Sequence, residues 1–98
     1  MTIKQNRDGS KLTLALEGRL DTTTAPQLEE ALKTSLAEIS DLVLDFEKLE
    51  YISSAGLRVV LAAQKQMQQQ GSMVVCHVNE MVMEVFDLTG FADILTIK

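Results

Sequence analysis

Two adjacent serines, Ser53 and Ser54, are the residues of this sequence whose type and placement could support regulated chemistry. They follow an apolar segment and open a helical pattern, and the small residues Ala55 and Gly56 come directly after them. A hydroxyl at such a bare helix start is accessible to a protein kinase, and the free N–H groups and dipole of a helix N-terminus favour an added phosphate. Serine is also a preferred N-cap residue, and glycine tolerates close backbone approach. Taken alone, the pattern favours capping over phosphorylation.

The other polar groups do not form a catalytic constellation. Cys76 and His77, the only cysteine and the only histidine, are neighbours on a predicted strand. They are therefore expected to point to opposite faces and cannot form a nucleophile–base pair. Nor can one cysteine and one histidine build a zinc site alone, and Asp45 is an acid in an apolar strand without a visible cluster of further ligands. We expect no catalytic residue, no metal and no cofactor.

Composition and charge narrow the classes of partner. The 98 residues suffice for one domain, residues 1–98, and carry a net charge of −5. Nucleic acids and anionic membranes require basic surfaces, so the excess of acid argues against both. No apolar run approaches the ~18 residues of a membrane helix, and the first residues lack the profile of a secretion signal. A single cysteine allows no intrachain disulfide, so we expect a cytoplasmic chain whose partner is a protein or a small molecule.

Strand and helix patterns alternate along the chain and must position the serines. Alternating apolar and polar residues predict strands, whereas apolar residues three and four positions apart predict helices. The expected strands are residues 2–5, 11–17, 42–46, 73–78 and 92–97. The expected helices are residues 24–39, 54–70 and 80–88. Thr23 or Thr24 is expected to cap the first helix, and residues 18–24 and 47–52 are expected as connections.

The order of these segments constrains the fold. An Asp-Gly pair at residues 8–9 predicts an antiparallel hairpin of the first two strands. Strand–helix–strand connections require parallel pairing and right-handed crossovers. Residues 42–46 and 73–78 are expected as central strands, the former covered on both faces, because they are apolar with little alternation. We predict an α/β fold: a mixed sheet of four to five strands with about three to four helices packed mainly on one side.

Short motifs spread over nearly the whole chain share the order and spacing of a known family. They are Glu-Gly-Arg-Leu-Asp at 17–21 with Ala25 and Leu28, Leu-Val-Leu-Asp-Phe at 42–46 with Leu49, Tyr51 and Ile52, Ser-Ser-Ala-Gly-Leu at 53–57, Val-Val-Cys at 74–76, and Val82 with residues 86–90. Together they resemble the STAS domain, specifically the single-domain anti-sigma factor antagonists with their EGxLD and DSSGL segments. The resemblance implies a STAS-like sheet.

The resemblance also implies a partner-switching function. In that family the unphosphorylated antagonist binds an anti-sigma factor that is also a serine kinase, and this binding releases the sigma factor. The kinase then phosphorylates a serine of the DSSGL segment, the complex dissociates, and a serine phosphatase resets the switch. Ser54 matches that serine. The residues expected to contact the partner are Asp21, Thr22, Thr23, Ser53, Ser54, Gly56 and Arg58.

Two positions of the serine segment depart from the family pattern. Ser53 stands where the family has an aspartate, and Ala55 stands where it has a second serine. Three interpretations follow: altered kinase recognition, transfer of the acceptor role to Ser53, or loss of the acceptor. The departures also keep an alternative function open, that of a STAS-type docking or ligand-binding module in a sensory or transport assembly, without phosphorylation.

Overall fold

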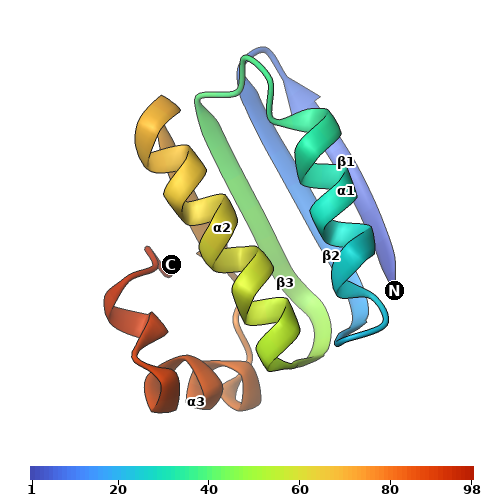
Figure 1. The fold of residues 1–98 in the computed structure, drawn as a ribbon, viewed down its shortest axis with the longest axis vertical. Helices are drawn as coiled ribbons and strands as arrows, with labels where there is room; N and C mark the ends of the chain where they lie inside the picture. The colour runs from blue at the N-terminus through green and yellow to red at the C-terminus, as the bar shows by residue number, and fades with distance from the viewer.

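A mixed β-sheet forms one layer of the molecule, which the computed structural model describes over residues 1–98 (Figure 1). Its four strands are β1 (Thr2–Asp8), β2 (Lys11–Leu20), β3 (Asp41–Ile52) and β4 (Ser72–Cys76). They lie in the order β1-β2-β3-β4. β1 and β2 form an antiparallel hairpin, and β2, β3 and β4 run parallel to one another. The predicted mixed α/β sheet is confirmed.

Helices form the second layer. They are α1 (Ala25–Ser35), α2 (Ser54–Gln70) and α3 (Glu80–Thr89), and a short 3-10 helix, η1 (Phe91–Asp93), follows. α1 and α2 lie in front of the same face of the sheet, and α3 crosses below the first turns of α2 (Figure 1). None of these helices is both long and apolar enough to cross a membrane. Because α1 and α2 cover the same face of the sheet, the predicted packing of the helices mainly on one side is confirmed.

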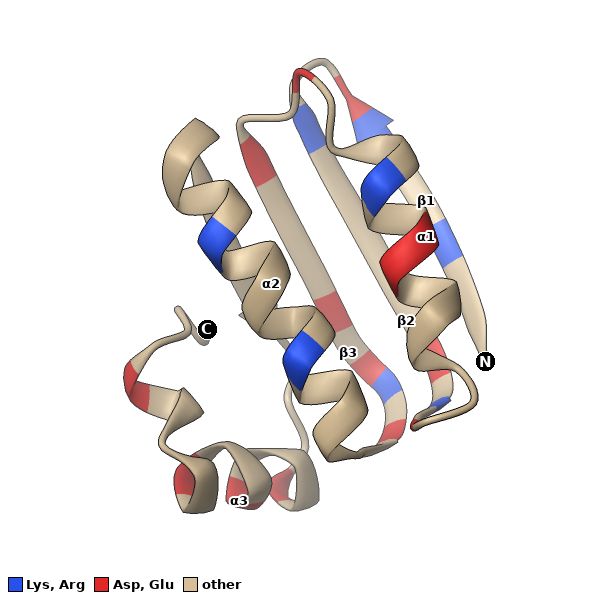
Figure 2. Cartoon of the chain, viewed as in Figure 1, with Lys and Arg blue, Asp and Glu red and all other residues tan.

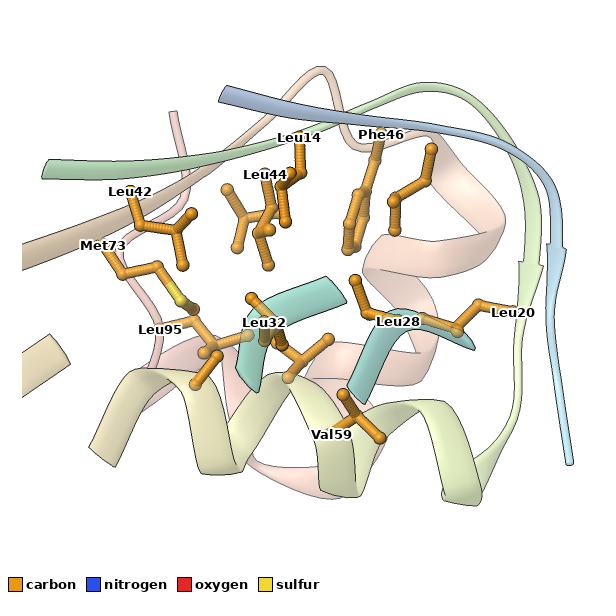
Figure 3. Close-up of a cluster of buried hydrophobic side chains, with 14 of the residues drawn as sticks. Leu14, Leu20, Leu28, Leu32, Leu42, Leu44, Phe46, Val59, Met73 and Leu95 are labelled. Carbon is orange, nitrogen blue, oxygen red and sulfur yellow. The ribbon is translucent and has the colours of Figure 1, made fainter. Parts of the chain in front are cut away.

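The core lies between the sheet and the helices. Leu14, Leu44 and Phe46 point from the strands toward the helices, and each is 0% exposed. Figure 3 shows them facing Leu28 of α1 and Val59 of α2. Burying one such side chain contributes about 1.5–3 kcal/mol. Because a slip of one residue would turn every one of these side chains to the other face, the core fixes the register of the strands.

The structure corrects the expected extents of several elements. Residues 47–52 belong to β3 and are not a connection, because the parallel pairing with β2 continues to Leu20 and Ile52. α1 ends at Ser35, before the predicted residue 39, although Leu36 and Ile39 are still buried. The predicted strand over residues 92–97 is reduced to an isolated bridge between Ile97 and β4.

The structure also corrects the expected surroundings of β3 and β4. β3 is central, but only one of its faces is covered, since Val43 and Asp45 are half-buried on the face that carries no helix. β4 is the last strand of the sheet and not a central one. Its short sequence is apolar because Met73 and Val75 are buried against the helices and Val74 and Cys76 are half-buried on the other face. The bridge to Ile97 pairs part of its outer edge. The sheet thus has a helix-covered face and an open face.

Candidate functional site

The candidate site lies where the carboxyl ends of β2 and β3 meet. These strands are parallel, with Leu20 paired to Ile52. Parallel strands end at the same edge of a sheet, so the segments that follow them are neighbours. The backbone N–H of Ser53 donates to the carbonyl of Leu20 over 2.9 Å and ties the two segments together. This pairing brings the loop of residues 21–24 beside the start of α2.

Ser53 and Ser54 occupy different environments at the start of α2. Ser53 is the N-cap residue, and its half-buried hydroxyl accepts a hydrogen bond from the N–H of Gly56 over 3.4 Å. Ser54 is the first residue of the helix; it is exposed, and its hydroxyl makes no hydrogen bond within the chain. Ser53 therefore caps the helix, and Ser54 is the exposed serine. The sequence alone could not assign these two roles.

Gly56 positions the first turn of α2 against the sheet. It is buried, and a Cβ atom at this position would lie 2.6 Å from Cγ of Leu20 and 3.0 Å from Cγ1 of Ile52. No real Cβ tolerates the shorter of these separations without a shift of its neighbours. Gly56 therefore acts by letting the helix start approach the ends of β2 and β3.

Asp21 organises the loop that precedes α1. Its Oδ1 accepts hydrogen bonds from the hydroxyl of Thr23 over 2.7 Å and from the N–H groups of Thr23 and Thr24 over 3.0 and 3.2 Å. The Thr23 hydroxyl, which has the largest effect, and these N–H groups lower the pKa of Asp21 against the opposing effect of desolvation. These hydrogen bonds hold the loop in a turn that presents Thr22 and Thr23 to solvent.

The predicted cap of α1 needs a correction. Thr24 is the N-cap residue, but its side chain makes no capping hydrogen bond. Its hydroxyl instead donates to the carbonyl of Arg19 over 2.8 Å and accepts from the N–H of Asp21 over 2.8 Å. The backbone carbonyl of Asp21 receives the N–H of Ala25 over 2.8 Å. Asp21 therefore accepts the N–H groups at the start of α1, a role that the sequence analysis assigned to Thr23 or Thr24.

A shallow hollow of about 220 Å³ separates the first turns of α1 and α2. It is lined by Thr22, Ala25, Pro26, Glu29, Ala55, Arg58 and Val59. Arg58 is exposed at its edge, on the second turn of α2. We call the exposed residues Thr22, Thr23, Ser54 and Arg58, together with this hollow, the helix-start surface.

The helices differ in charge (Figure 2). Arg58 and Lys65 are the only charged residues of α2, whereas α3 carries three acids and no base. Ser54 therefore lies on a helix without a single carboxylate. A negative group added there would lie near the basic Arg58 and the positive end of the helix dipole, while the acid Glu29 of α1 also lines the hollow.

Arg19 and Tyr51 belong to the same edge, although the sequence did not single out either as a contact residue. They are register partners at the ends of β2 and β3, and the Arg19 guanidinium lies 4.4 Å from the centroid of the Tyr51 ring. The Arg19 side chain also approaches Asp21, with Nε 3.8 Å from Oδ2. The sequence could have indicated that Arg19 and Tyr51 are neighbours only through the parallel pairing of β2 with β3. That pairing requires β3 to continue to Ile52.

The expectation that Cys76 and His77 point to opposite faces is wrong. β4 ends at Cys76, and His77 adopts a left-handed backbone with φ of 57°, so the alternation of a strand stops there. The Sγ atom of Cys76 lies 3.6 Å from Nδ1 of His77, which is 2.9 Å from Oδ1 of Asp45. Sequence periodicity gives no sign of a left-handed histidine.

These three groups also affect one another's pKa. The hydrogen bond to Asp45, followed by its charge, raises the pKa of His77. Desolvation would raise the pKa of Asp45, but the Glu47 N–H and His77 together lower it. Desolvation raises the pKa of the Cys76 thiol, and the charges of Asp45 and Glu47 add to this. At neutral pH Cys76 is therefore a poor nucleophile, and Cys76 and His77 do not act as a nucleophile–base pair.

Comparison with known proteins identifies the family. The family model described as the STAS domain matches residues 2–98. BtrV of Bordetella bronchiseptica, which bears the name of an anti-sigma factor antagonist, is 38% identical over 99% of this chain and 85% of its own length. The anti-sigma-B factor antagonist of Bacillus subtilis is 31% identical over 98% of this chain and 87% of its own. Relatives of this kind are regulatory binding proteins and not enzymes.

Solved structures agree with this fold. An anti-sigma factor antagonist from Mycobacterium paratuberculosis matches with a TM-score of 0.89 at 23% identity, covering 98% of this chain and 83% of that one. The anti-sigma factor antagonist SpoIIAA, in its unphosphorylated form, matches with a TM-score of 0.78 at 16% identity, covering 99% and 87%. At such low identity these matches concern the fold alone. With the family match over residues 2–98, they lead to one conclusion: the chain belongs to the STAS domain family.

Proposed function

We propose that this chain is an anti-sigma factor antagonist that binds an anti-sigma factor through the helix-start surface, and that phosphorylation of Ser54 switches the binding off. The names of the relatives support the broader part of this proposal. One observation carries the rest: Ser54 is exposed with a free hydroxyl, while the neighbouring Ser53 caps the helix. Ser53 is the second candidate for the acceptor.

The start of α2 can hold a phosphate without unfolding. The N–H groups of Ser54 and Ala55 lie in the first turn and have no partner within the helix. Arg58 follows Ser54 by four residues, the spacing at which exposed helical side chains are neighbours. A phosphoserine adds about −1.5 to −2 charges and three strong acceptors, which these donors can receive. The modified chain is therefore expected to keep its fold.

The same phosphate would block docking. A partner seated on the helix-start surface would cover Ser54 and remove water from it. Burying a phosphate dianion against a surface that offers no matching cation costs several kcal/mol. A loss of only about 3 kcal/mol already reduces affinity by more than 100-fold. The switch then acts locally at the interface and requires no rearrangement of the sheet.

The departure at Ser53 is compatible with this switch. Aspartate and serine are both preferred N-cap residues, so the replacement retains the cap and removes only a negative charge beside the acceptor. SpoIIAA has been solved unphosphorylated and phosphorylated, and this chain matches the two forms with TM-scores of 0.78 and 0.77. Both forms therefore share the overall fold of this chain, so phosphorylation does not abolish that fold in SpoIIAA. The proposed partners are an anti-sigma factor serine kinase and a serine phosphatase.

The acceptor can be identified by intact mass. The chain would be incubated with ATP and the anti-sigma factor kinase of its own organism. We expect the gain of one phosphate, which is lost in Ser54→Ala. Ser53→Asp is the matched control, because it removes the other hydroxyl, retains a capping side chain, and should still gain the phosphate. A phosphate that persists in Ser54→Ala would contradict the assignment, and no gain at all would favour the docking module without phosphorylation.

A further inference from the structure

Three side chains with metal-binding atoms lie together on the open face of the sheet: Asp45, Cys76 and His77. One oxygen, the sulfur and one ring nitrogen all lie within 4.8 Å of one another. We propose that they form a binding site for a divalent transition-metal ion, with Zn²⁺ the best match. The site lies on the sheet face opposite the helix layer that carries Ser54, so it is independent of the proposed switch.

The fold brings the three residues together in two ways. Asp45 and Cys76 are register partners on the parallel strands β3 and β4. Their neighbours Leu44 and Val75 are fully buried beneath the helices, so alternation turns Asp45 and Cys76 to the open face. His77 would point away if the strand continued, but its φ of 57° returns the imidazole to the same side.

The separations suit a tetrahedral ion. Zn–S bonds of about 2.3 Å and Zn–N bonds of about 2.0–2.1 Å, at a tetrahedral angle, hold sulfur and nitrogen about 3.6 Å apart. Sγ of Cys76 and Nδ1 of His77 are 3.6 Å apart. The same geometry holds nitrogen and oxygen about 3.3 Å apart, and Nδ1 of His77 lies 2.9 Å from Oδ1 of Asp45. A small side-chain rotation admits an ion in place of the proton between them.

The donor set selects the class of metal. Zn²⁺ accepts thiolate, imidazole and carboxylate ligands together, whereas Mg²⁺ and Ca²⁺ prefer oxygen. The carboxylate of Asp45 is also oriented from outside the site, because its Oδ1 accepts the N–H of Glu47 over 3.0 Å. The His77 side chain is 60% exposed, which leaves an approach for the ion and room for water as a fourth ligand.

Cobalt titration tests the site, because Co²⁺ adopts the same tetrahedral coordination and reports a thiolate ligand by a charge-transfer band. Chelator-treated protein without a tag would be titrated with Co²⁺, and the bound ion then displaced with Zn²⁺. Cys76 is the only cysteine, so the band can have no other source in the chain. We expect one ion per chain and full displacement by Zn²⁺.

Variants distinguish the three-residue site from a lone thiol. Cys76→Ser should abolish the band. Asp45→Asn and His77→Asn should each weaken Co²⁺ binding by more than the about 10–100-fold typical of losing an outer partner of a ligand. Asparagine tolerates a left-handed backbone, so His77→Asn keeps the turn. Asp41→Asn is the matched control, since this exposed acid at the other end of β3 lies outside the cluster.

Circular dichroism would show that each variant is folded. The proposal is overturned by the absence of a charge-transfer band at stoichiometric Co²⁺. It is equally overturned if Asp45→Asn and His77→Asn bind as tightly as Asp41→Asn, because the ion would then be held by the sulfur alone. Neither result bears on Ser54, so the proposed switch can stand or fail separately.

Discussion

At the residue scale, the neighbouring Ser53 and Ser54 have different roles: one caps a helix and the other is exposed to solvent. Ser53 turns its hydroxyl inward to the N–H of Gly56, and Ser54 leaves its hydroxyl in solvent. Gly56 makes this division possible, because the missing Cβ lets the first turn of α2 approach Leu20. Gly56 therefore contributes to the site by fixing the position of the exposed Ser54 hydroxyl; it is itself buried and has no side chain to contact a partner.

Replacement of this glycine should be costly. In Gly56→Ala the new methyl would lie 2.6 Å from Cγ of Leu20, a fully buried side chain with little freedom to move. Overpacking of this kind costs about 1–3 kcal/mol, which outweighs the gain of up to about 1 kcal/mol in helix propensity. Urea denaturation should show a net loss in the free energy of unfolding.

Ser54→Ala supplies the control for that measurement, since it changes an exposed residue of the same turn. Its free energy of unfolding should stay within about 0.5 kcal/mol of the parent. Equal stability of Gly56→Ala and the parent would show that α2 can shift away from the sheet, and that the position of Ser54 is not fixed by this contact.

Asn79 has a comparable role at the element scale, where it joins α3 to the end of β3. Its side-chain oxygen accepts the N–H of Val82 over 2.8 Å, and its amide donates to the carbonyl of Leu49 over 2.8 Å. Loss of an N-cap costs about 0.5–2 kcal/mol. Loss of the hydrogen bond to Leu49 costs about 1 kcal/mol more. Asn79→Ala should therefore destabilise the fold by about 1.5–3 kcal/mol in thermal or urea unfolding.

Asn79→Ser separates the two contributions, because serine can cap the helix but cannot reach Leu49 with an amide. It should lose only about 1 kcal/mol relative to the parent. If Asn79→Ser and Asn79→Ala were equally destabilised, the cap would contribute nothing and the attachment of α3 would depend on the Leu49 contact alone.

The same elements show what the sequence could predict. The limits of α2 at residues 54 and 70 follow from its apolar stripe, its serine cap and Gly71, all of which are local signals. The continuation of β3 through Lys48 and Glu50 has no such signal, because it depends on pairing with β2 across shifts in register. The left-handed turn at His77 is likewise a tertiary result. Local capping was therefore predictable, whereas the Asp45–Cys76–His77 cluster was not.

The whole molecule presents two faces with different chemistry. The helix-covered face ends in the helix-start surface, where Arg58 and the hollow between α1 and α2 surround Ser54. The open face carries the proposed metal site on β3 and β4. A single sheet holds the two apart, so that a phosphate on one face and an ion on the other would act without touching.

The affinity for the anti-sigma factor tests the central claim most directly. Isothermal titration calorimetry would compare the parent chain, Ser54→Asp, and the uncharged Ser54→Asn of equal size, after circular dichroism has shown the same fold for all three. The account predicts that Ser54→Asp binds more than about 100-fold more weakly than the parent, the equivalent of about 3 kcal/mol, while Ser54→Asn stays close to it. Equal affinity of Ser54→Asp and Ser54→Asn would contradict the account, because negative charge at this position would then have no effect on docking.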